Sequence, residues 1–516
     1  MCGIFSVFDF KGRLDSGREN AFRAALRTLS HRGPDDEGWL RTDRHFLGHR
    51  RLSIMDLSSA GHQPMVSPCG GVTMVFNGQI YNWKQLRTQL EGLGHVFASQ
   101  CDTESILLGY LEWGEEIFTK LTGMWAVVLV DERAGKLVVS RDRLGIKPLY
   151  EGVGENGELI FASEIKAIRP FVPGADTVDT TVAKRYMARG WLDDVSKTLY
   201  TGVRNFPAGC ISVWENGVRR DRRFWTHPIP QRRATDIRAM RDLLIEVVDD
   251  HTQSDAPLAT TLSGGIDSST INAIMARELG KRTSIHAFSV DAPDIPDESP
   301  LIDETVRELG IQHEYICLNH LDYIREIDAM LDVHDEPTFS VGQLNQFMFR
   351  KKVHERGYKV LLVGDGADEV LAGYAKIVPM YVSALMDAGL NEQAEQVLHL
   401  SSELTGLGHD EAKSRLDLFR RTGVGGRTVQ EYRFGYEMFS EAERPVDARM
   451  GFHKTHDQIR FLPSGQDLFQ ELLDRMIVDI PQILRNEDRN GMAHGIEIRP
   501  VFLDHRLIEL AWSYPF

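Results

Sequence analysis

Residues 257–280 read PLATTLSGGIDSSTINAIMARELG, and this stretch decides the fold of the C-terminal half of the chain. A short apolar run ends in a Ser-Gly-Gly turn, which a helical pattern follows at once. Backbone N–H groups in such a turn and the positive end of the following helix attract an anion, which predicts a phosphate-binding loop. The GK[ST] ending of a Walker motif is missing, so transfer of a γ-phosphate is disfavoured. A glycine pair also occurs in ordinary tight turns, and the function therefore depends on further motifs.

A second glycine loop follows in KVLLVGDGADEVLAGY, residues 359–374. The order is again strand, loop and helix, with acidic side chains at Asp365, Asp368 and Glu369. Carboxylates beside a phosphate site predict Mg²⁺. Strand-like SIHAFSV and HEYICL alternate with helical segments between the two loops, which is typical of an α/β doubly wound parallel sheet. After about residue 375 the pattern is mostly helical.

The N-terminal part of the chain has a different pattern. Short strands such as VTMVFNG and MWAVVLV are separated by Gly, Asn and Asp turns, and helical segments are few, which predicts an α+β sheet sandwich. The segment THPIPQRRATD, residues 226–236, has no apolar period and is typical of a linker. We therefore expect a first domain over residues 2–210, a linker over 211–235 and a second domain over 236–516.

Bulk composition restricts the class of protein. Apolar residues make up 42% and charged residues 26% of the 516 residues, as in ordinary globular enzymes of more than one domain. The net charge of -16, without a basic run, disfavours nucleic acid and anionic membrane surfaces as partners. Five scattered cysteines without a CxxC pair predict neither a disulfide framework nor a zinc site, and no leader or membrane span is recognisable. We expect a cytoplasmic enzyme that acts on small molecules.

Cys2 is a candidate nucleophile. Removal of Met1 would give it a free α-amine beside its thiol, so that one residue would supply both nucleophile and base. A cysteine at this position is more often a small packed residue, so its role depends on the motifs that follow. These motifs are HRGPD (31–35), GHRRLSIMD (48–56), FNGQIYN (76–82), CDTE (101–104) and RDRLGIKPLY (141–150).

In this order, the motifs resemble the N-terminal-nucleophile glutaminase domain of class II glutamine amidotransferases. The resemblance implies an αββα sandwich in which Cys2 attacks the side-chain amide of glutamine, while Asn77 and the N–H of Gly78 form an oxyanion hole. Each donor of such a hole lowers the barrier by roughly 3 kcal/mol. The resemblance also implies that Arg51 binds the α-carboxylate of glutamine and that Asp102 binds its α-ammonium.

Gln79 departs from the related domains, which read NGEIYN where this chain reads NGQIYN. The substitution removes a carboxylate that helps to hold glutamine. Because Gln79 can still accept a hydrogen bond, we expect weaker glutamine binding and not an inactive site. On this interpretation a Gln79→Glu variant has a lower KM for glutamine.

The two glycine loops, together with MAHGIEIRPVFLDH (492–505), resemble the synthetase domain of the glutamine-hydrolysing asparagine synthetase family, which has the PP-loop ATP pyrophosphatase fold. The resemblance implies that a carboxylate attacks the α-phosphate of ATP, releases pyrophosphate and forms an acyl-adenylate, which ammonia then opens. Asp267 and Asp368 would hold Mg²⁺, and Asp365 would orient the acyl-adenylate or accept a proton from ammonia. The residues that would contact ATP or pyrophosphate are Leu262, Ser263, Gly264, Gly265, Asp267, Ser268, Ser269, Val290 and Gly364. A buried passage for ammonia and a possible homodimer belong to the same expectation.

Of the substrates, the acceptor carboxylate is the one that the sequence specifies least. The segment HDEPTFSVGQLNQF (334–347) places Ser340 roughly where aspartate-using relatives have an arginine. Aspartate is the first expectation, and a sugar uronic acid, a peptide or a natural-product acid is the alternative with the same chemistry. A lactam-forming synthetase has no use for a working Cys2, and intact Asn77, Asp267 and Asp368 disfavour a non-catalytic nucleotide-binding homologue.

Related chains also carry a lysine shortly beyond the FLDH segment. No lysine follows Lys454 here. We therefore expect a longer native chain, and we expect glutaminase activity with little amide synthesis when that cation is lacking.

Overall fold

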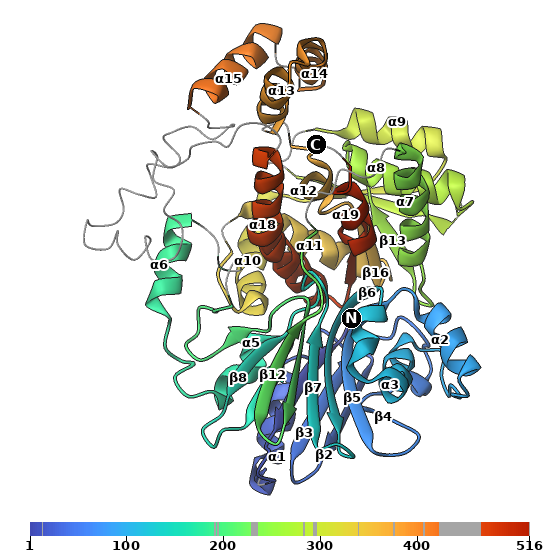
Figure 1. Cartoon of the computed structure of the whole chain (residues 1–516), viewed down its shortest axis with the longest axis vertical. Helices are drawn as coiled ribbons and strands as arrows, with labels where there is room; N and C mark the ends of the chain where they lie inside the picture. The colour runs from blue at the N-terminus through green and yellow to red at the C-terminus, as the bar shows by residue number, and fades with distance from the viewer. Residues whose placement is uncertain are drawn as a thin grey trace.

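The computed structural model describes residues 1–12, 14–189, 192, 196–228, 236–281, 284–292, 297–338, 340–374, 377–405, 408–422 and 466–514. The described strands form two six-stranded sheets and one five-stranded sheet. Figure 1 shows the two six-stranded sheets in the lower half of the molecule and the five-stranded sheet among helices in the upper half.

The two six-stranded sheets are antiparallel. The first has the strand order β10 (Arg204–Asn205), β8 (Tyr150–Val153), β9 (Leu159–Ala162), β1 (Gly3–Phe8), β3 (His45–Arg51) and β2 (Asp36–Arg41). The second has the order β12 (Val218–Arg223), β11 (Cys210–Glu215), β7 (Lys136–Arg141), β6 (Gly123–Asp131), β5 (Val72–Ile80) and β4 (Met65–Val66).

These sheets are the inner layers of a sandwich. All six residues of β1 are buried, because one of its faces packs on the second sheet and the other on helices. Ile4 shares a core cluster with Val75 of the second sheet, whereas Phe5 packs in a cluster with α1 (Glu19–Arg27). On the outer face of the second sheet, α3 (Asp102–Trp113) and α2 (Trp83–Gly92) cover β5. The expected αββα arrangement is confirmed.

Part of the segment expected as a linker is a hairpin. The strands β11 and β12 occupy Cys210–Glu215 and Val218–Arg223, and β11 pairs with β7 of the second sheet. Asn216 and Gly217 join them with φ values of 52° and 79°, as a two-residue hairpin turn requires. The expectation of a linker beginning at residue 211 is therefore wrong, because the Asn-Gly turn folds this segment into a hairpin that extends the second sheet. Residues 229–235 of that segment lie outside the described residues.

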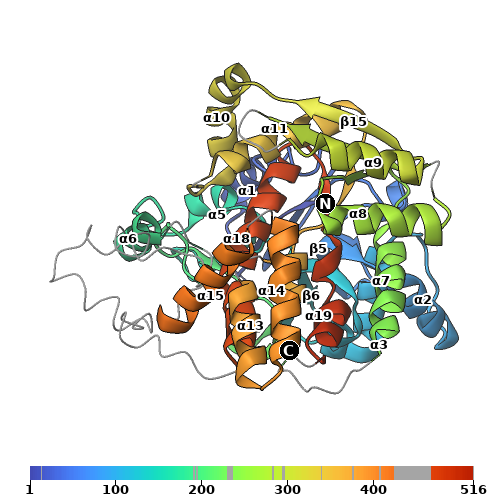
Figure 2. The same cartoon turned by 90° about the horizontal axis from the view of Figure 1, so that it is seen from above.

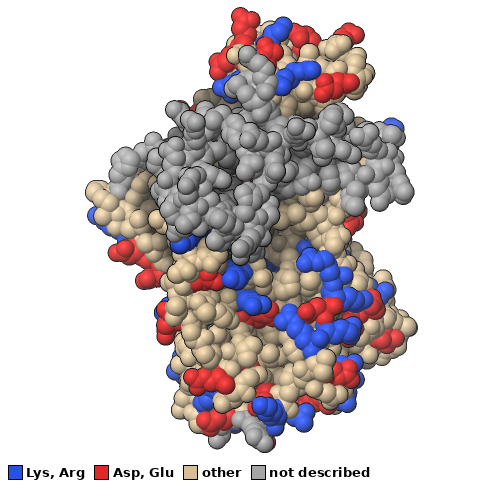
Figure 3. All heavy atoms as spheres, turned by 60° about the vertical axis from the view of Figure 1, so that its left-hand side comes forward, with Lys and Arg blue, Asp and Glu red and all other residues tan. Residues whose placement is uncertain are grey.

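The edge strand β12 is rich in arginine. Three of its arginines, Arg219, Arg220 and Arg222, form ion pairs with Glu151, Glu115 and Glu116. Charged side chains on an edge strand discourage pairing with another chain. Figure 3 shows basic and acidic side chains lying among one another on one face of the molecule.

The five-stranded sheet is parallel. Its order is β15 (Gln312–Cys317), β14 (His286–Asp291), β13 (Leu258–Thr261), β16 (Val360–Val363) and β17 (Glu497–Pro500). The strand order reverses between β13 and β16, and in sheets of this kind ligands bind at the carboxyl ends of the strands at such a reversal. Both glycine loops lie at this reversal, so the α/β doubly wound expectation is confirmed.

Helices cover both faces of the parallel sheet. One face packs on α7 (Ile237–His251) and α8 (Ile266–Ala273), and the other packs on α11 (Val341–Glu355). Figure 2 shows α7 and α8 at the right of the view, and α10 (His320–His334) and α11 at its upper left. The C-terminal half also contains α9 (Ser299–Leu309), α12 (Ala367–Leu371), α13 (Val378–Asp387), α14 (Asn391–Thr405), α15 (His409–Thr422), α18 (Gln466–Met492) and α19 (His505–Ala511).

A membrane-crossing helix would need about twenty apolar residues in succession. Among the residues that the structure describes, none of the helices combines that length with that apolar character.

Candidate active sites

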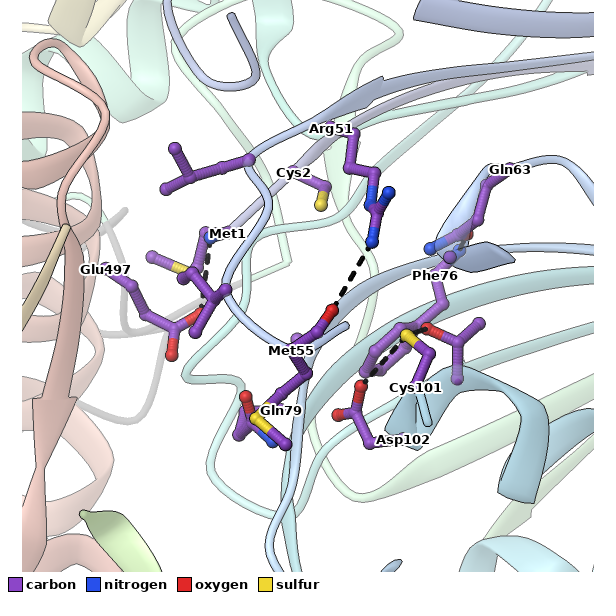
Figure 4. A pocket seen from close by; sticks show the side chains of 15 residues that line it. Met1, Cys2, Arg51, Met55, Gln63, Phe76, Gln79, Cys101, Asp102 and Glu497 are labelled. Atoms are coloured by element: carbon purple, nitrogen blue, oxygen red, sulfur yellow. Dashed lines mark hydrogen bonds and ion pairs between the residues drawn. The ribbon is translucent and has the colours of Figure 1, made fainter. Parts of the chain in front are cut away.

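The first candidate site is a cavity of about 30 Å³ where β1 and β5 meet the C-terminal half of the chain. Its walls include Met1, Cys2, Gln79, Asp102 and Glu497, which come from both halves of the sequence. Figure 4 shows Met1 beside Glu497, with Gln79 and Asp102 on other walls of the same cavity. A space of this size holds about two water molecules, so glutamine can enter only if surrounding side chains move.

Cys2 is fixed from two sides. Its backbone N–H donates to Oδ1 of Asn77 over 2.8 Å, and its carbonyl accepts a bond from Nε of Arg32 over 3.0 Å. Burial raises the pKa of the Cys2 thiol. The α-ammonium of Met1, one residue before, pairs with Oε2 of Glu497 at 3.2 Å, and both groups are buried. With Met1 present, the nitrogen of Cys2 is an amide and not an amine.

Asn77 is arranged as an oxyanion donor would be. Its Oδ1 accepts the backbone N–H of Cys2, so its Nδ2 is the atom that can donate to a ligand. Within the described residues this buried Nδ2 has no hydrogen-bond partner. Gly78 lies next to it on β5, where a Cβ would come within 2.1 Å of the carbonyl oxygen of Met124 on β6. Only glycine fits here, because the opposing atoms belong to backbone.

Arg51 lines the cavity, but its guanidinium already supports a loop. Nη1 donates to the carbonyl of Ser58 over 2.7 Å, and Nη2 donates to the carbonyls of Asp56 and Met55 over 2.5 and 3.3 Å. Three of its five N–H donors are thus in use. The arginine does not present a free fork to a carboxylate in this structure.

Asp102 begins α3 and is buried at the cavity. Its Oδ2 accepts the backbone N–H of Ile80 over 2.7 Å. Burial raises the pKa of Asp102 to about 6, against the effect of that hydrogen bond. The carboxylate can therefore accept a cationic group at neutral pH.

Two residues at this cavity were missed by the sequence analysis. Glu497 lines the cavity, and Arg499 donates from Nη2 to Oε1 of Gln79 over 3.0 Å. Both lie on β17, in the MAHGIEIRPVFLDH motif that was assigned to the other half of the chain. The sequence does contain one sign of their role, because these two charged residues alternate with Ile496 and Ile498. In the structure all four side chains are buried.

The second candidate site lies where β13 and β16 end. A Cβ on Gly364 would lie 3.0 Å from the Cβ of Asp267, so the two glycine loops are in contact. Ser263 donates from its backbone N to Oγ of Ser268 over 2.9 Å, and the backbone N–H of Gly264 donates to Oε2 of Glu298 over 2.9 Å. These bonds hold the first loop around the start of α8.

The residues expected to contact ATP are distributed over three neighbouring strands. Leu262, Ser263, Gly264 and Gly265 follow β13, Asp267, Ser268 and Ser269 lie in the first turn of α8, Val290 lies near the end of β14 and Gly364 follows β16. The fold therefore brings these residues to one edge of the sheet. Their contact with a nucleotide stays a prediction.

An acidic cluster surrounds the second loop. Burial, together with the neighbouring carboxylates of Asp368 and Glu369, raises the pKa of Asp267 to about 6. Burial and the nearby Glu487 raise the pKa of Asp365 to about 8. Among the described residues, no group of three or more His, Cys, Asp or Glu side chains is arranged to hold a metal by itself.

A second, smaller cavity of about 10 Å³ lies at Asp365 and shares Met1 as a wall with the cavity at Cys2. Its walls include Met1, Lys147, Asp365 and Glu487. Met1 is therefore a wall of the cavity at Cys2 and also of the cavity at Asp365.

Ser340, the residue in the place of an arginine, caps α11. Its Oγ accepts the backbone N–H of Gly342 over 3.1 Å. Arg350, farther along the same helix, is buried and forms an ion pair with Glu487 of α18.

Comparison with known proteins agrees with this division. Residues 1–225 match a family described as glutamine amidotransferase domain, and residues 239–516 match a family described as asparagine synthase. The chain is 28% identical to asparagine synthetase (glutamine-hydrolysing) 3 of Bacillus subtilis (strain 168) over 541 residues, covering 100% of this chain and 81% of that protein. It is 32% identical to asparagine synthetase B (glutamine-hydrolysing) of Escherichia coli (strain K12) over 391 residues, covering 72% and 65%. It is 29% identical to amidase chry2 of Gibberella zeae over 405 residues, covering 72% and 59%.

The asparagine synthase match spans more than half of the chain, and it contains both glycine loops and β17. The chain therefore belongs to the asparagine synthase family, with a glutamine amidotransferase domain preceding the synthase part.

Proposed function

We propose that this chain is a glutamine-dependent amidotransferase that uses ATP to convert a carboxylate, in the first place aspartate, into an amide. It releases ammonia from glutamine at Cys2 and adenylates the acceptor carboxylate at the second site, with AMP and pyrophosphate as further products. The observation that carries the proposal is the position of Met1, which is a wall of both the Cys2 cavity and the Asp365 cavity.

In the glutaminase half, the proposal requires removal of Met1. The amine of Cys2 would then lie beside Oδ1 of Asn77 and could take the proton of the thiol. Nδ2 of Asn77 and the backbone N–H of Gly78 would stabilise the oxyanion of the tetrahedral intermediate. Arg51, Gln79 and Asp102 would bind the glutamine.

Loss of Met1 would also open a route for ammonia. The Met1 side chain and the bond between its α-ammonium and Glu497 would both disappear. Because the same residue is a wall of both cavities, we expect its removal to join them into the buried passage that the family resemblance implies.

In the synthetase half, the first loop and the start of α8 would hold the phosphates of ATP. Asp267 and Asp368 fit a Mg²⁺ site, because Mg²⁺ is commonly bound by one or two carboxylates together with substrate phosphates. When bound, the ion would neutralise charge on the leaving pyrophosphate. Asp365 would orient the acyl-adenylate or take a proton from ammonia.

The metal role has a direct test. Asp267→Asn and Asp368→Asn variants should release pyrophosphate far more slowly and require more Mg²⁺, while glutamine hydrolysis persists. Normal release at normal Mg²⁺ concentration in both variants would remove the assignment.

The acceptor is tested by measuring AMP and pyrophosphate formation against a panel of carboxylates, with glutamine or an ammonium salt as nitrogen donor. Aspartate should stimulate release and yield asparagine. If no carboxylate in the panel stimulates release while the protein is folded and binds ATP, the proposal fails.

The same chemistry on a different acid is the second candidate. Ser340 is used as a helix cap, and the charge of Arg350 on the same helix is paired with Glu487. Neither residue offers a free cation to a second carboxylate of aspartate. Sugar uronic acids, peptides and natural-product acids therefore belong in the panel.

We further propose that the glutaminase unit extends through β12 and that the synthetase unit begins at α7, since each set of elements forms its own sheets. A cytoplasmic location fits the free cysteines of the chain, which a reducing compartment preserves. The expected homodimer stays a prediction, which the mass of the protein in solution tests.

A further inference from the structure

Arg499 of the synthetase half contacts Gln79, a wall residue of the cavity at Cys2, which is called the glutamine cavity below. It lies on β17 and is fully buried, with an exposed fraction of 0%. Nη1 donates to the carbonyls of His251 and Gln253 over 2.6 and 2.8 Å, and Nε donates to Oε1 of Glu497 over 2.6 Å. Its Nη2 donates to Oε1 of Gln79 over 3.0 Å. The guanidinium is thus held rigidly by its own half of the chain while it contacts the other half.

This contact determines which end of the Gln79 amide faces Arg499. An arginine has only donors, so the atom of Gln79 that faces Arg499 must be the oxygen. The other end of the amide is therefore the donor Nε2. Gln79 is 1% exposed, and within the described part of the chain its Nε2 has no partner. Gln79 is also a wall of the cavity that contains Cys2 and Asp102 (Figure 4).

A buried N–H without a partner favours a ligand that brings an acceptor. Glutamine brings two charged groups, an α-carboxylate that needs donors and an α-ammonium that needs acceptors. Asp102 on the same cavity supplies an acceptor, whereas Arg51 has committed three of its N–H groups to the loop carbonyls. Two N–H groups of Arg51 lie outside these bonds, and Nε2 of Gln79 is a further donor for the carboxylate on the same cavity.

The position along β5 agrees with this role. Gln79 and Asn77 are two residues apart on one strand, so both side chains lie on the same face, roughly 7 Å apart. Asn77 bonds to Cys2, where the side-chain amide of glutamine reacts. Gln79 then lies toward the α-carbon end of an extended glutamine.

We propose that Arg499 is a positioning residue for the glutaminase half, and that it orients Gln79 so that Nε2 donates to the α-carboxylate of glutamine. The inference rests on the proposed glutaminase function. It reverses the expectation, drawn from the sequence, that a carboxylate at position 79 would tighten glutamine binding.

The test compares hydrolysis of L-glutamine with hydrolysis of its α-carboxamide, in which a neutral amide replaces the carboxylate. A Gln79→Glu variant keeps Arg499 paired, but it removes the donor and brings a negative charge to the α-carboxylate. For this variant we expect kcat/KM for glutamine to fall about tenfold or more through KM, with a smaller change for the α-carboxamide. Gln79→Met should likewise reduce the preference for glutamine.

An Arg499→Met variant should reduce the same preference, because Gln79 loses its orientation. The double variant Gln79→Met with Arg499→Met should lose little more than either single variant, since both act on one contact. Pyrophosphate release with ammonium salt reports whether the synthetase half of Arg499→Met is folded. If that activity is lost, the inference is tested by the preference of the two Gln79 variants for glutamine over its α-carboxamide.

The matched control is Trp83→Phe, which removes the bond from Trp83 Nε1 to Oε1 of Gln253 at the same interface without touching Gln79. It should keep the preference for glutamine. A lower KM for glutamine in Gln79→Glu, or an unchanged preference in both Gln79 variants, would overturn the inference and leave the glutaminase proposal intact. A wild-type protein that hydrolyses no glutamine would instead overturn the glutaminase proposal.

Discussion

At the scale of single residues, Cys2 separates the two proposed activities. A Cys2→Ala variant should lose glutamine hydrolysis and keep amide formation from an ammonium salt, because residues of the second half form the adenylating site. The measurement is glutamate release from glutamine beside pyrophosphate release with ammonium. Cys69→Ala, at an exposed cysteine, serves as control and should keep both activities. Loss of both activities in a folded Cys2→Ala protein would contradict the division.

Asp102 predicts the pH dependence of glutamine use. Burial raises the pKa of this carboxyl to about 6, so it is ionised above that pH and protonated below it. Only the ionised form attracts the α-ammonium of glutamine. We therefore expect kcat/KM for glutamine to fall as the pH drops through about 6, because kcat/KM follows the pKa of the free enzyme.

The control for this profile is Asp102→Asn, which cannot titrate. Its kcat/KM should be lower near neutral pH and should not show the fall near pH 6. If the variant retains the same acidic limb as the wild type, another group is responsible for it.

At the scale of elements, β5 depends on a glycine at position 78. A Cβ there would lie 2.1 Å from the carbonyl oxygen of Met124 and 2.9 Å from Cα of Trp125, so β5 and β6 would have to separate. Gly78→Ala should slow glutamine hydrolysis by about 100-fold or more, because the proposed oxyanion donors move with the strand. Activity with ammonium salt should change much less.

Gly92→Ala provides the matched control for the strand prediction. Gly92 ends α2, and a Cβ at this position meets no atom within 4 Å. The variant should hydrolyse glutamine at the wild-type rate. Equal rates in Gly78→Ala and Gly92→Ala would show that the close approach of β6 has no bearing on the site.

At the scale of the whole molecule, buried ion pairs join the two halves. Arg32 donates from Nη1 to Glu164 over 2.9 Å and to Asp488 over 2.7 Å, and all three residues are buried. Arg489 adds a contact of 2.9 Å to the same oxygen of Glu164. The cluster crosses the interface, since Arg32 and Glu164 belong to the first half and Asp488 and Arg489 to the second.

An Arg32→Met variant should be much less stable, because it leaves Glu164 and Asp488 buried with less compensating charge. Breaking such a pair costs about 3 to 5 kcal/mol in the free energy of unfolding. Urea unfolding measures the effect. In the control Arg87→Met, loss of the partly exposed pair with Glu91 should cost about 0.5 kcal/mol. Equal losses in the two variants would contradict the role of burial.

Local sequence patterns were sufficient to predict the fold class of each half. The glycine loops at Ser263 and Gly364, the alternation of strands with helices and the motifs after Cys2 are all local patterns, and the sheets follow them. The hairpin over Cys210–Arg223 also has a local signal, because Asn216-Gly217 favours a two-residue turn between strands. Local patterns suffice here because turns, strand periods and helix starts depend on residues close together in the chain.

Only the tertiary structure decided how the two halves complete one another. The contact of Gln79 with Arg499 joins residues 420 positions apart, and Met1 is a wall of two cavities that are also lined by distant segments. The sequence of β5 does not predict a contact with β17, nor the reverse, because burial of each strand in its own sheet already explains its pattern. The packing of the two halves sets these contacts, and for that reason the direction of the Gln79 amide could be assigned only from the folded chain.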